Sequence, residues 1–131
     1  QPPRLEHIVP NTPEEVPKYA PTGVREATDY YRTARAQHPN SQNWILVRSI
    51  DRIAEYSAYD HVDMISPHPL LMIAGTNADT RYFSEMAIEK AKEPKELFLI
   101  EGATHIGLYD KKEYVDPAVE KLNGFFNQHL Q

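Results

Sequence analysis

Two apolar runs separated by one helix-forming segment constrain the fold of this chain more than any other feature. Leu70–Gly75 reads LLMIAG, carries no charge and is bounded by Pro69, as is typical of a strand buried on both faces. Residues 95–101 (KELFLIE) predict a second strand, and residues 84–93 predict a helix between them, with Ser84 as its N-cap. The order strand, helix, strand predicts a parallel sheet with helices on its faces.

The flanking segments predict helices and turns. Residues 1–23 hold six of the 11 prolines and predict an extended path. Residues 24–36 predict a helix, as do residues 44–56, although WILV at 44–47 could begin as a strand. Residues 61–69 predict a helical turn, and Pro117 is expected as the first residue of a last helix.

Two parallel strands are too few for a stable sheet, because a buried strand needs neighbours to pair its backbone groups. Each buried, unpaired backbone group costs about 1–3 kcal/mol, against a net stability of roughly 5–15 kcal/mol. The first residues, QPPR, resemble neither an initiator methionine nor a signal peptide. We therefore expect the rest of the sheet to come from elsewhere, and the chain to be part of something longer.

Composition narrows the classes of function. The net charge of −5, from 14 basic and 19 acidic residues without a basic tract, argues against nucleic acid or an anionic membrane as partner and favours a small-molecule substrate. The absence of cysteine excludes disulfides, thiolate catalysis and iron–sulfur clusters. No apolar run approaches the roughly 18–20 residues that span a bilayer. The histidines outside the site discussed next lack metal-ligand spacing, so neither a metal nor a cofactor is expected; they are His7, His38, His61, His68 and His129.

Asp79 and His105 each follow one of the predicted strands. Asp79 comes four residues after Gly75, and His105 comes three residues after Gly102. Functional groups of parallel sheets gather at the carboxyl ends of the strands, and an imidazole beside a carboxylate is a general base with its orienting partner. We expect a carboxylate oxygen of Asp79 near Nδ1 of His105. The alternatives are that Asp79 caps a turn or helix and that His105 is an ordinary loop histidine.

The segments ISPHPLLMIAG (65–75), EPKELFLIEGATH (93–105) and LYD (108–110) resemble, in this order, the C-terminal part of α/β-hydrolases of the dienelactone-hydrolase-like kind, near the polyketide-transferase-type group. The resemblance covers residues 24–131. It implies an α/β fold in which the chain supplies the last two parallel strands and flanking helices of a three-layer sandwich, incomplete alone. Residues 67–131 would form this βαβα core part, and residues 1–66 the helical excursion at the cap position.

The resemblance also implies a catalytic triad, with Asp79 as the acid and His105 as the base. The nucleophile is missing: no Gly-x-Ser-x-Gly pentapeptide occurs, because no two of the five glycines are four positions apart. His68 stands where relatives usually carry arginine, and Gly107 where many carry aspartate. Contacts near the triad are therefore expected to differ.

Two functions remain open. In the first, the chain is the C-terminal portion of a serine-type hydrolase acting on ester or thioester-like carbonyl substrates, inactive alone and partnered by the N-terminal part that carries the nucleophile. In the second, it is a non-catalytic partner that completes the sheet of another chain or binds a ligand. Tyr30 and Tyr31 could line the substrate cap or simply pack. A homo-oligomer is left open, and so is the compartment, with the cytoplasm favoured.

Overall fold

The computed structural model describes residues 2–130. The chain divides into two compact units, Gln1–Ser57 and Ala58–Gln131. Each unit has a two-stranded sheet of its own. The sheet of the first unit is antiparallel and that of the second is parallel. We describe each unit by itself.

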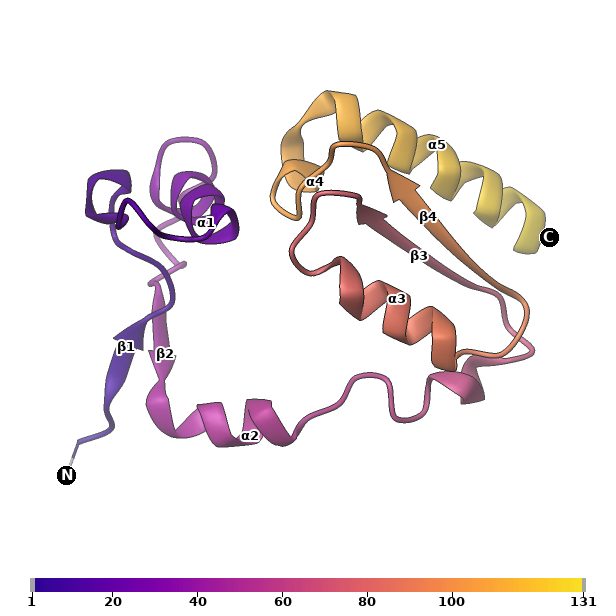
Figure 1. The fold of residues 1–131 in the computed structure, drawn as a ribbon, viewed down its shortest axis with the longest axis horizontal. Helices are drawn as coiled ribbons and strands as arrows, with labels where there is room; N and C mark the ends of the chain where they lie inside the picture. Colours follow the sequence, from indigo (N-terminus) through magenta and orange to yellow (C-terminus); the bar gives the residue numbers. More distant parts are fainter. Residues whose placement is uncertain (1, 131) are drawn as a thin grey trace. The chain divides into compact units, whose positions relative to one another are not determined.

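The first unit consists of a short β-ribbon and helices (Figure 1). Strand β1 (Leu5–His7) pairs with β2 (Trp44–Leu46), so that Leu5 lies opposite Leu46. Helix α1 (Thr22–Arg32) fulfils the prediction for residues 24–36, beginning and ending slightly earlier. The remaining elements are the 3-10 helices η1 (Pro13–Glu15) and η2 (Val47–Ser49) and helix α2 (Ile50–Glu55).

The prediction of one helix over residues 44–56 is wrong for residues 44–46. These residues form strand β2, as the alternative interpretation of WILV allowed. Asn43 adopts a left-handed backbone conformation with φ of 58°, which breaks any helix before Trp44. Its side chain accepts a hydrogen bond from Val9 N (3.1 Å) and donates one to Val9 O (2.8 Å). The ring of Trp44 stacks on His7 with centroids 3.9 Å apart. These long-range contacts stabilise the β-ribbon, and the sequence around either strand does not predict them.

The second unit is a strand–helix–strand core followed by two helices. Strand β3 (Leu70–Gly75) pairs in parallel with β4 (Lys95–Ile100), so that Gly75 lies beside Ile100. Helix α3 (Arg81–Lys90) connects them, and α4 (Gly107–Asp110) and α5 (Lys112–His129) follow. Figure 1 shows the two strands side by side, with α3 on one side of them and α5 on the other. Both predicted strands and their parallel order are confirmed.

Both predicted helix starts in this unit are wrong. Helix α3 begins at Arg81 and not after Ser84, because the Arg81 amide bonds to Ala78 O (3.1 Å) and its side chain pairs with Glu85 (3.0 Å). Helix α5 begins at Lys112, with Pro117 inside it. The amides of Tyr114 and Val115 both donate to Lys111 O at 2.9 Å, which closes a first turn ahead of the proline.

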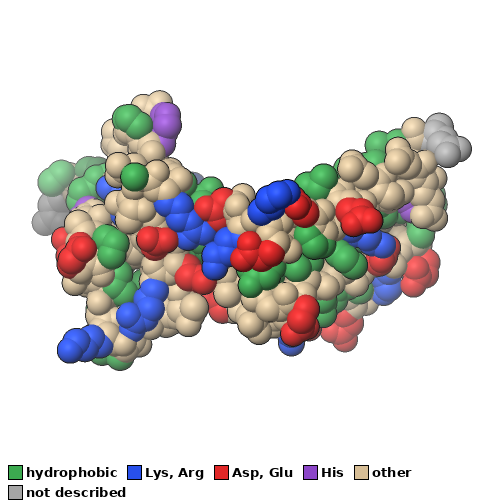
Figure 2. Space-filling view, turned by 90° about the horizontal axis from the view of Figure 1, so that it is seen from above, with side chains coloured by type: hydrophobic (Ala, Val, Ile, Leu, Met, Phe, Trp, Pro, Cys, Tyr) green, Lys and Arg blue, Asp and Glu red, His purple; other side chains and the backbone are tan. Residues whose placement is uncertain are grey.

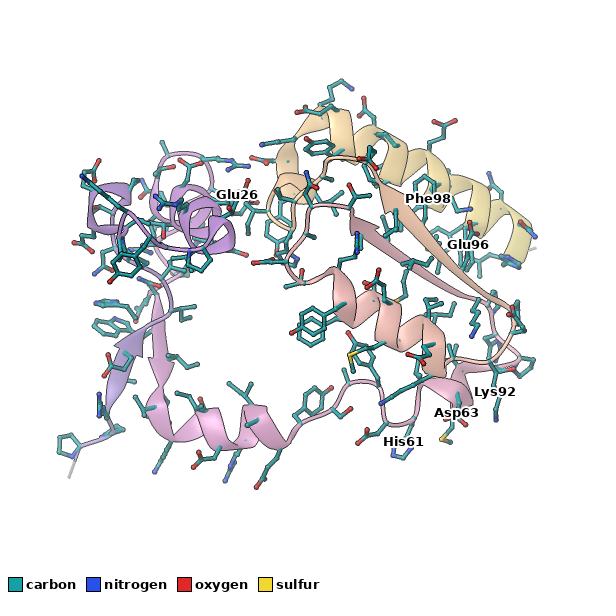
Figure 3. The ribbon with its side chains drawn as sticks, in the orientation of Figure 1. Glu26, His61, Asp63, Lys92, Glu96 and Phe98 are labelled. Carbon is teal, nitrogen blue, oxygen red and sulfur yellow. The ribbon has the colours of Figure 1, made fainter. Side chains whose placement is uncertain are left out.

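The two compact units meet between Ser57 and Ala58. The 3-10 helix η3 (Val62–Ile65) packs with the second unit. Asp63 forms an ion pair of 3.2 Å with Lys92, and the two side chains point toward one another in Figure 3. Ser66 Oγ also donates to Glu93 O at 2.8 Å. The cap-position role of residues 1–66 stays a prediction.

Small side chains make up most of the buried core of the described residues. Seven apolar residues are buried, and four of them are alanines: Val62, Ala74, Ala87, Ala91, Ile100, Ala103 and Ile106. Larger apolar side chains stay exposed, including Tyr82 at 51% and Phe126 at 47%. On the face seen in Figure 2, hydrophobic side chains appear between interspersed acidic and basic ones. None of the helices in the described part of the chain is long and apolar enough to cross a membrane.

Candidate active site

The carboxyl ends of β3 and β4 are tied together by backbone contacts. The amide of Thr76 donates to Ile100 O and that of Asn77 donates to Ala103 O, both at 3.0 Å. The Gly102 amide donates to Thr76 Oγ1 at 2.8 Å. The two loops that follow the strands therefore lie against each other, as the parallel order requires.

Gly75 makes this close approach possible. A Cβ at this position would lie 2.0 Å from the carbonyl oxygen of Ala103, a distance that no side chain tolerates. Ala103 itself is completely buried. Glycine at the end of β3 thus allows the loop leading to His105 to pack directly on the strand backbone.

His105 is presented by a single helical turn. The Leu108 amide donates to Thr104 O (3.3 Å), and the Gly107 amide donates to Thr104 Oγ1 (3.0 Å). Gly107 is buried, and a Cβ there would lie 2.9 Å from Thr104 Oγ1. An aspartate, which the resemblance leads one to expect at position 107, would therefore press on the side chains of Thr104 and Tyr114. The glycine therefore belongs to the local geometry that orients His105.

Both ring nitrogens of His105 lie within hydrogen-bond distance of hydroxyl groups. Thr80 Oγ1 is 2.9 Å from Nδ1, and Tyr109 Oη is 2.7 Å from Nε2. Thr80 immediately precedes α3, whereas Tyr109 lies one helical turn after His105, with the two rings edge to face at 5.3 Å. The imidazole is thus held between the two strand-end loops.

The expected bond between Asp79 and Nδ1 is wrong for this structure. Thr80, the next residue, occupies Nδ1, and within residues 2–130 neither a hydrogen bond nor an ion pair joins Asp79 to His105. Asp79 is exposed in the turn between β3 and α3. The strand ends do converge as predicted, but the side chain that reaches across is the hydroxyl and not the carboxylate. The catalytic roles of Asp79 and His105 stay a prediction.

A pocket of about 350 Å³ opens beside His105 within the second unit. Its lining includes backbone and side chains from the end of β3, the start of α3 and the turn after His105; among them are Ile73, Ala78, Thr80, Phe83, His105 and Leu108. It has the size of a small-molecule site, with mostly apolar walls and a few convergent polar groups. His105 is the one histidine that lines this pocket.

Tyr30 and Tyr31 lie on α1 in the first unit, with their rings edge to face at 5.0 Å. The guanidinium of Arg35 lies 5.1 Å from the centre of the Tyr30 ring. Tyr31 lines a pocket of about 300 Å³ together with Arg32 and Asn43. Their role as substrate contacts stays a prediction.

Sequence reasoning missed Thr80 and Tyr109. One signal was available for each: Thr80 adjoins Asp79 at the same strand end, and Tyr109 follows His105 by four positions, the spacing of neighbours on one helix face. Among residues 2–130, no group of three or more histidine and acidic side chains could hold a metal ion.

Comparison with known proteins identifies similar chains of undetermined function. No family model matches. The uncharacterized protein PA2218 of Pseudomonas aeruginosa is 38% identical over 106 residues, which is 78% of this chain and 28% of that protein. The uncharacterized protein YcjY of Escherichia coli is 34% identical over 108 residues, which is 82% of this chain and 35% of that protein. The chain thus spans about a third or less of these relatives.

Solved structures show the fold. The crystal structure of PA2218 superposes with a TM-score of 0.83 at 33% identity, covering 97% of this chain and 39% of that one. The α/β hydrolase GrgF from Penicillium sp. sh18 gives 0.66 at 20% identity, and DcsB, in complex with its substrate analogue, gives 0.74 at 16%. Both cover 98% of this chain, and 43% and 44% of their own. The chain has an α/β fold of the α/β-hydrolase kind and corresponds to part of the length of these structures.

Proposed function

We propose that this chain is the C-terminal portion of a serine-type α/β-hydrolase of the dienelactone-hydrolase-like group, acting on ester or thioester-like carbonyl substrates. The observation that carries the proposal is the place of His105, at the carboxyl end of β4 and on the wall of the pocket of about 350 Å³. In parallel sheets this edge is where reacting groups gather. The shared fold with a structure described as an α/β hydrolase supports the proposal.

His105 would act as general base and then as general acid. Nε2 accepts the proton of the serine hydroxyl while the serine oxygen forms a bond to the substrate carbonyl carbon. When the tetrahedral intermediate collapses, the bond to the leaving group breaks and the same proton passes from Nε2 to that group. Water then repeats the two steps on the acyl-enzyme. Tyr109 must leave Nε2 for the first transfer, because its hydroxyl lies 2.7 Å from this nitrogen.

Asp79 would be the acid of the triad. It adjoins Thr80, whose hydroxyl binds Nδ1, so the role requires a rearrangement of this exposed loop that brings its carboxylate to the imidazole. A carboxylate there stabilises the imidazolium that forms when the serine loses its proton, which a neutral hydroxyl does far less well. We place this contact in the reacting state.

The partner would be the N-terminal part of the same hydrolase, which supplies the nucleophile and the oxyanion hole. In the described residues β3 pairs with β4 alone, so the opposite edge of β3 offers backbone groups for a further strand. The apolar side chains left exposed around the small alanine core offer surface for the same partner. A strand and helices added here would extend the sheet and cover that surface.

The test is labelling of the full-length protein with a fluorophosphonate probe, which reacts with activated serines. Covalent labelling of one serine, together with hydrolysis of a panel of aryl esters and thioesters, is the expected result. Labelling should require His105, so the His105→Ala variant stays unlabelled while the matched His61→Ala variant, altered at an exposed histidine of η3's leading turn, labels fully. A folded full-length protein that neither labels nor hydrolyses any ester contradicts the proposal.

The second candidate is a non-catalytic, ligand-binding or sheet-completing role. One observation favours it: His105 is surrounded by hydroxyl groups at both nitrogens and has no carboxylate bound at Nδ1. Under this reading the full-length protein binds small carbonyl compounds at the His105 pocket without turning them over. Absence of labelling combined with unchanged ligand affinity in His105→Gln would support it over the hydrolase.

A further inference from the structure

We infer that Thr80 is a positioning residue that fixes the tautomer of His105, holding the proton on Nδ1 so that Nε2 is the acceptor nitrogen. This inference rests on the proposed function, which it deepens. Nδ1–H is the tautomer that a general base facing a serine needs. By sequence alone a capping role would be expected for Thr80, because a threonine before a helix normally caps it.

The side chain of Thr80 does not cap α3. Thr80 is the N-cap residue of α3, yet its side chain makes no capping bond to the helix. The hydroxyl instead reaches across to the other strand end, 2.9 Å from Nδ1 of His105. Because threonine is branched at Cβ, few rotamers are open to it, and the oxygen is held in place at small entropic cost.

The hydroxyl of Tyr109, the imidazole of His105 and the hydroxyl of Thr80 form a hydrogen-bonded series with a preferred direction of donation. A neutral imidazole carries one N–H and one acceptor nitrogen, and the partner of each decides which is which. The phenol of Tyr109 is a more acidic donor than the alcohol of Thr80, so its O–H donates to Nε2 and Nδ1–H donates to Thr80 Oγ1. The reverse direction would pair the weaker donor with Nδ1. The two hydroxyls thus favour the tautomer of a general base before any carboxylate arrives.

This assigns separate tasks to two neighbouring residues. Thr80 would set the tautomer of the resting site, whereas Asp79 would stabilise the charge that appears during reaction. Substitution of Thr80 should therefore change the ground-state ring, and substitution of Asp79 should change turnover alone. The two residues become distinguishable by a measurement that does not depend on activity.

The experiment is a two-bond ¹H–¹⁵N correlation spectrum of the histidine rings in the full-length protein, with His105 assigned from His105→Gln. The wild type should show the Nδ1–H tautomer. Thr80→Val, which keeps the shape and removes the hydroxyl, should shift the tautomer ratio toward Nε2–H by about two- to tenfold, the worth of one hydrogen bond. Thr80→Ser should restore the wild-type ratio, and kcat/KM should follow the same order.

Two controls complete the design. Asp79→Asn should leave the tautomer unchanged, and so should Thr22→Val, the same chemical change at an exposed threonine of α1. If Thr80→Val fails to fold, Thr80→Ala removes the same hydroxyl without the branched methyl groups. An Nε2–H wild type, or a ratio that responds to Asp79→Asn and not to loss of the Thr80 hydroxyl, overturns the inference. If the wild-type protein is not labelled by the fluorophosphonate probe, the proposed function is overturned, whereas the measured tautomer of His105 is unaffected.

Discussion

At the scale of single residues, both hydrogen-bond partners of the His105 ring are uncharged hydroxyl groups. A carboxylate could therefore still stabilise the imidazolium that forms during the reaction. Thr80 and Tyr109 orient the ring without supplying a negative charge. As the proposed triad acid, Asp79 is expected to act on the imidazolium, so Asp79→Asn in the full-length protein should lower kcat on the order of 10³–10⁴-fold. Steady-state kinetics with an aryl ester measures this. Asp60→Asn, at another exposed aspartate of the second unit, is the matched control. A loss below about tenfold in Asp79→Asn would remove Asp79 from the triad.

The sequence was sufficient to predict that His105 and the loop of Asp79 meet at one edge of the sheet, because parallel strands bring their carboxyl ends together. It could not predict which of two adjacent side chains crosses to Nδ1. That choice depends on the rotation of the turn before α3, a helix that starts four residues earlier than Ser84 as its N-cap predicts. The contact of Tyr109 depends likewise on the helical turn 104–108, which has no strong local signal.

At the scale of elements, the packing of the His105 loop on β3 depends on Gly75. Gly75→Ala places a methyl carbon about 2.0 Å from Ala103 O, and should lower the free energy of unfolding of the full-length protein by about 1–3 kcal/mol or more. Urea denaturation measures the change. Gly124→Ala is the matched control: it lies inside α5 with nothing within 4 Å of the added carbon, and should stabilise by about 0.5–1 kcal/mol. Equal effects of the two substitutions would refute this packing.

Element type was predictable where one pattern dominates and failed where distant residues decide. The unbroken apolar run 70–75 and its partner 95–100 gave both strands of the parallel pair. The strand at Trp44 exists because it pairs with Leu5–His7, nearly forty positions earlier, and Asn43 closes that ribbon. A short segment of the sequence does not contain both of the strands that pair in this ribbon.

At the scale of the whole molecule, the residues described here bury little apolar volume. Most of the buried apolar side chains are alanines, while Tyr82 and Phe83 of α3 and Phe126 of α5 are exposed. The 131-residue chain expressed alone should therefore melt without cooperativity, whereas addition of the N-terminal part of the parent should produce one cooperative transition. Circular dichroism against temperature tests this. A sharp, cooperative melt of the isolated monomer would show that the chain needs no partner.

The central claim is that His105 performs the proton transfers of a hydrolase, and one measurement tests it most directly. In the full-length protein, kcat/KM for an ester that the wild type hydrolyses is compared between His105→Ala and His61→Ala. The first change should lower it on the order of 10⁴-fold or more, with the unfolding curve unchanged, because His105 is exposed and contributes little packing. The second should leave it at the wild-type value. Turnover in His105→Ala within a few-fold of wild type would contradict the account.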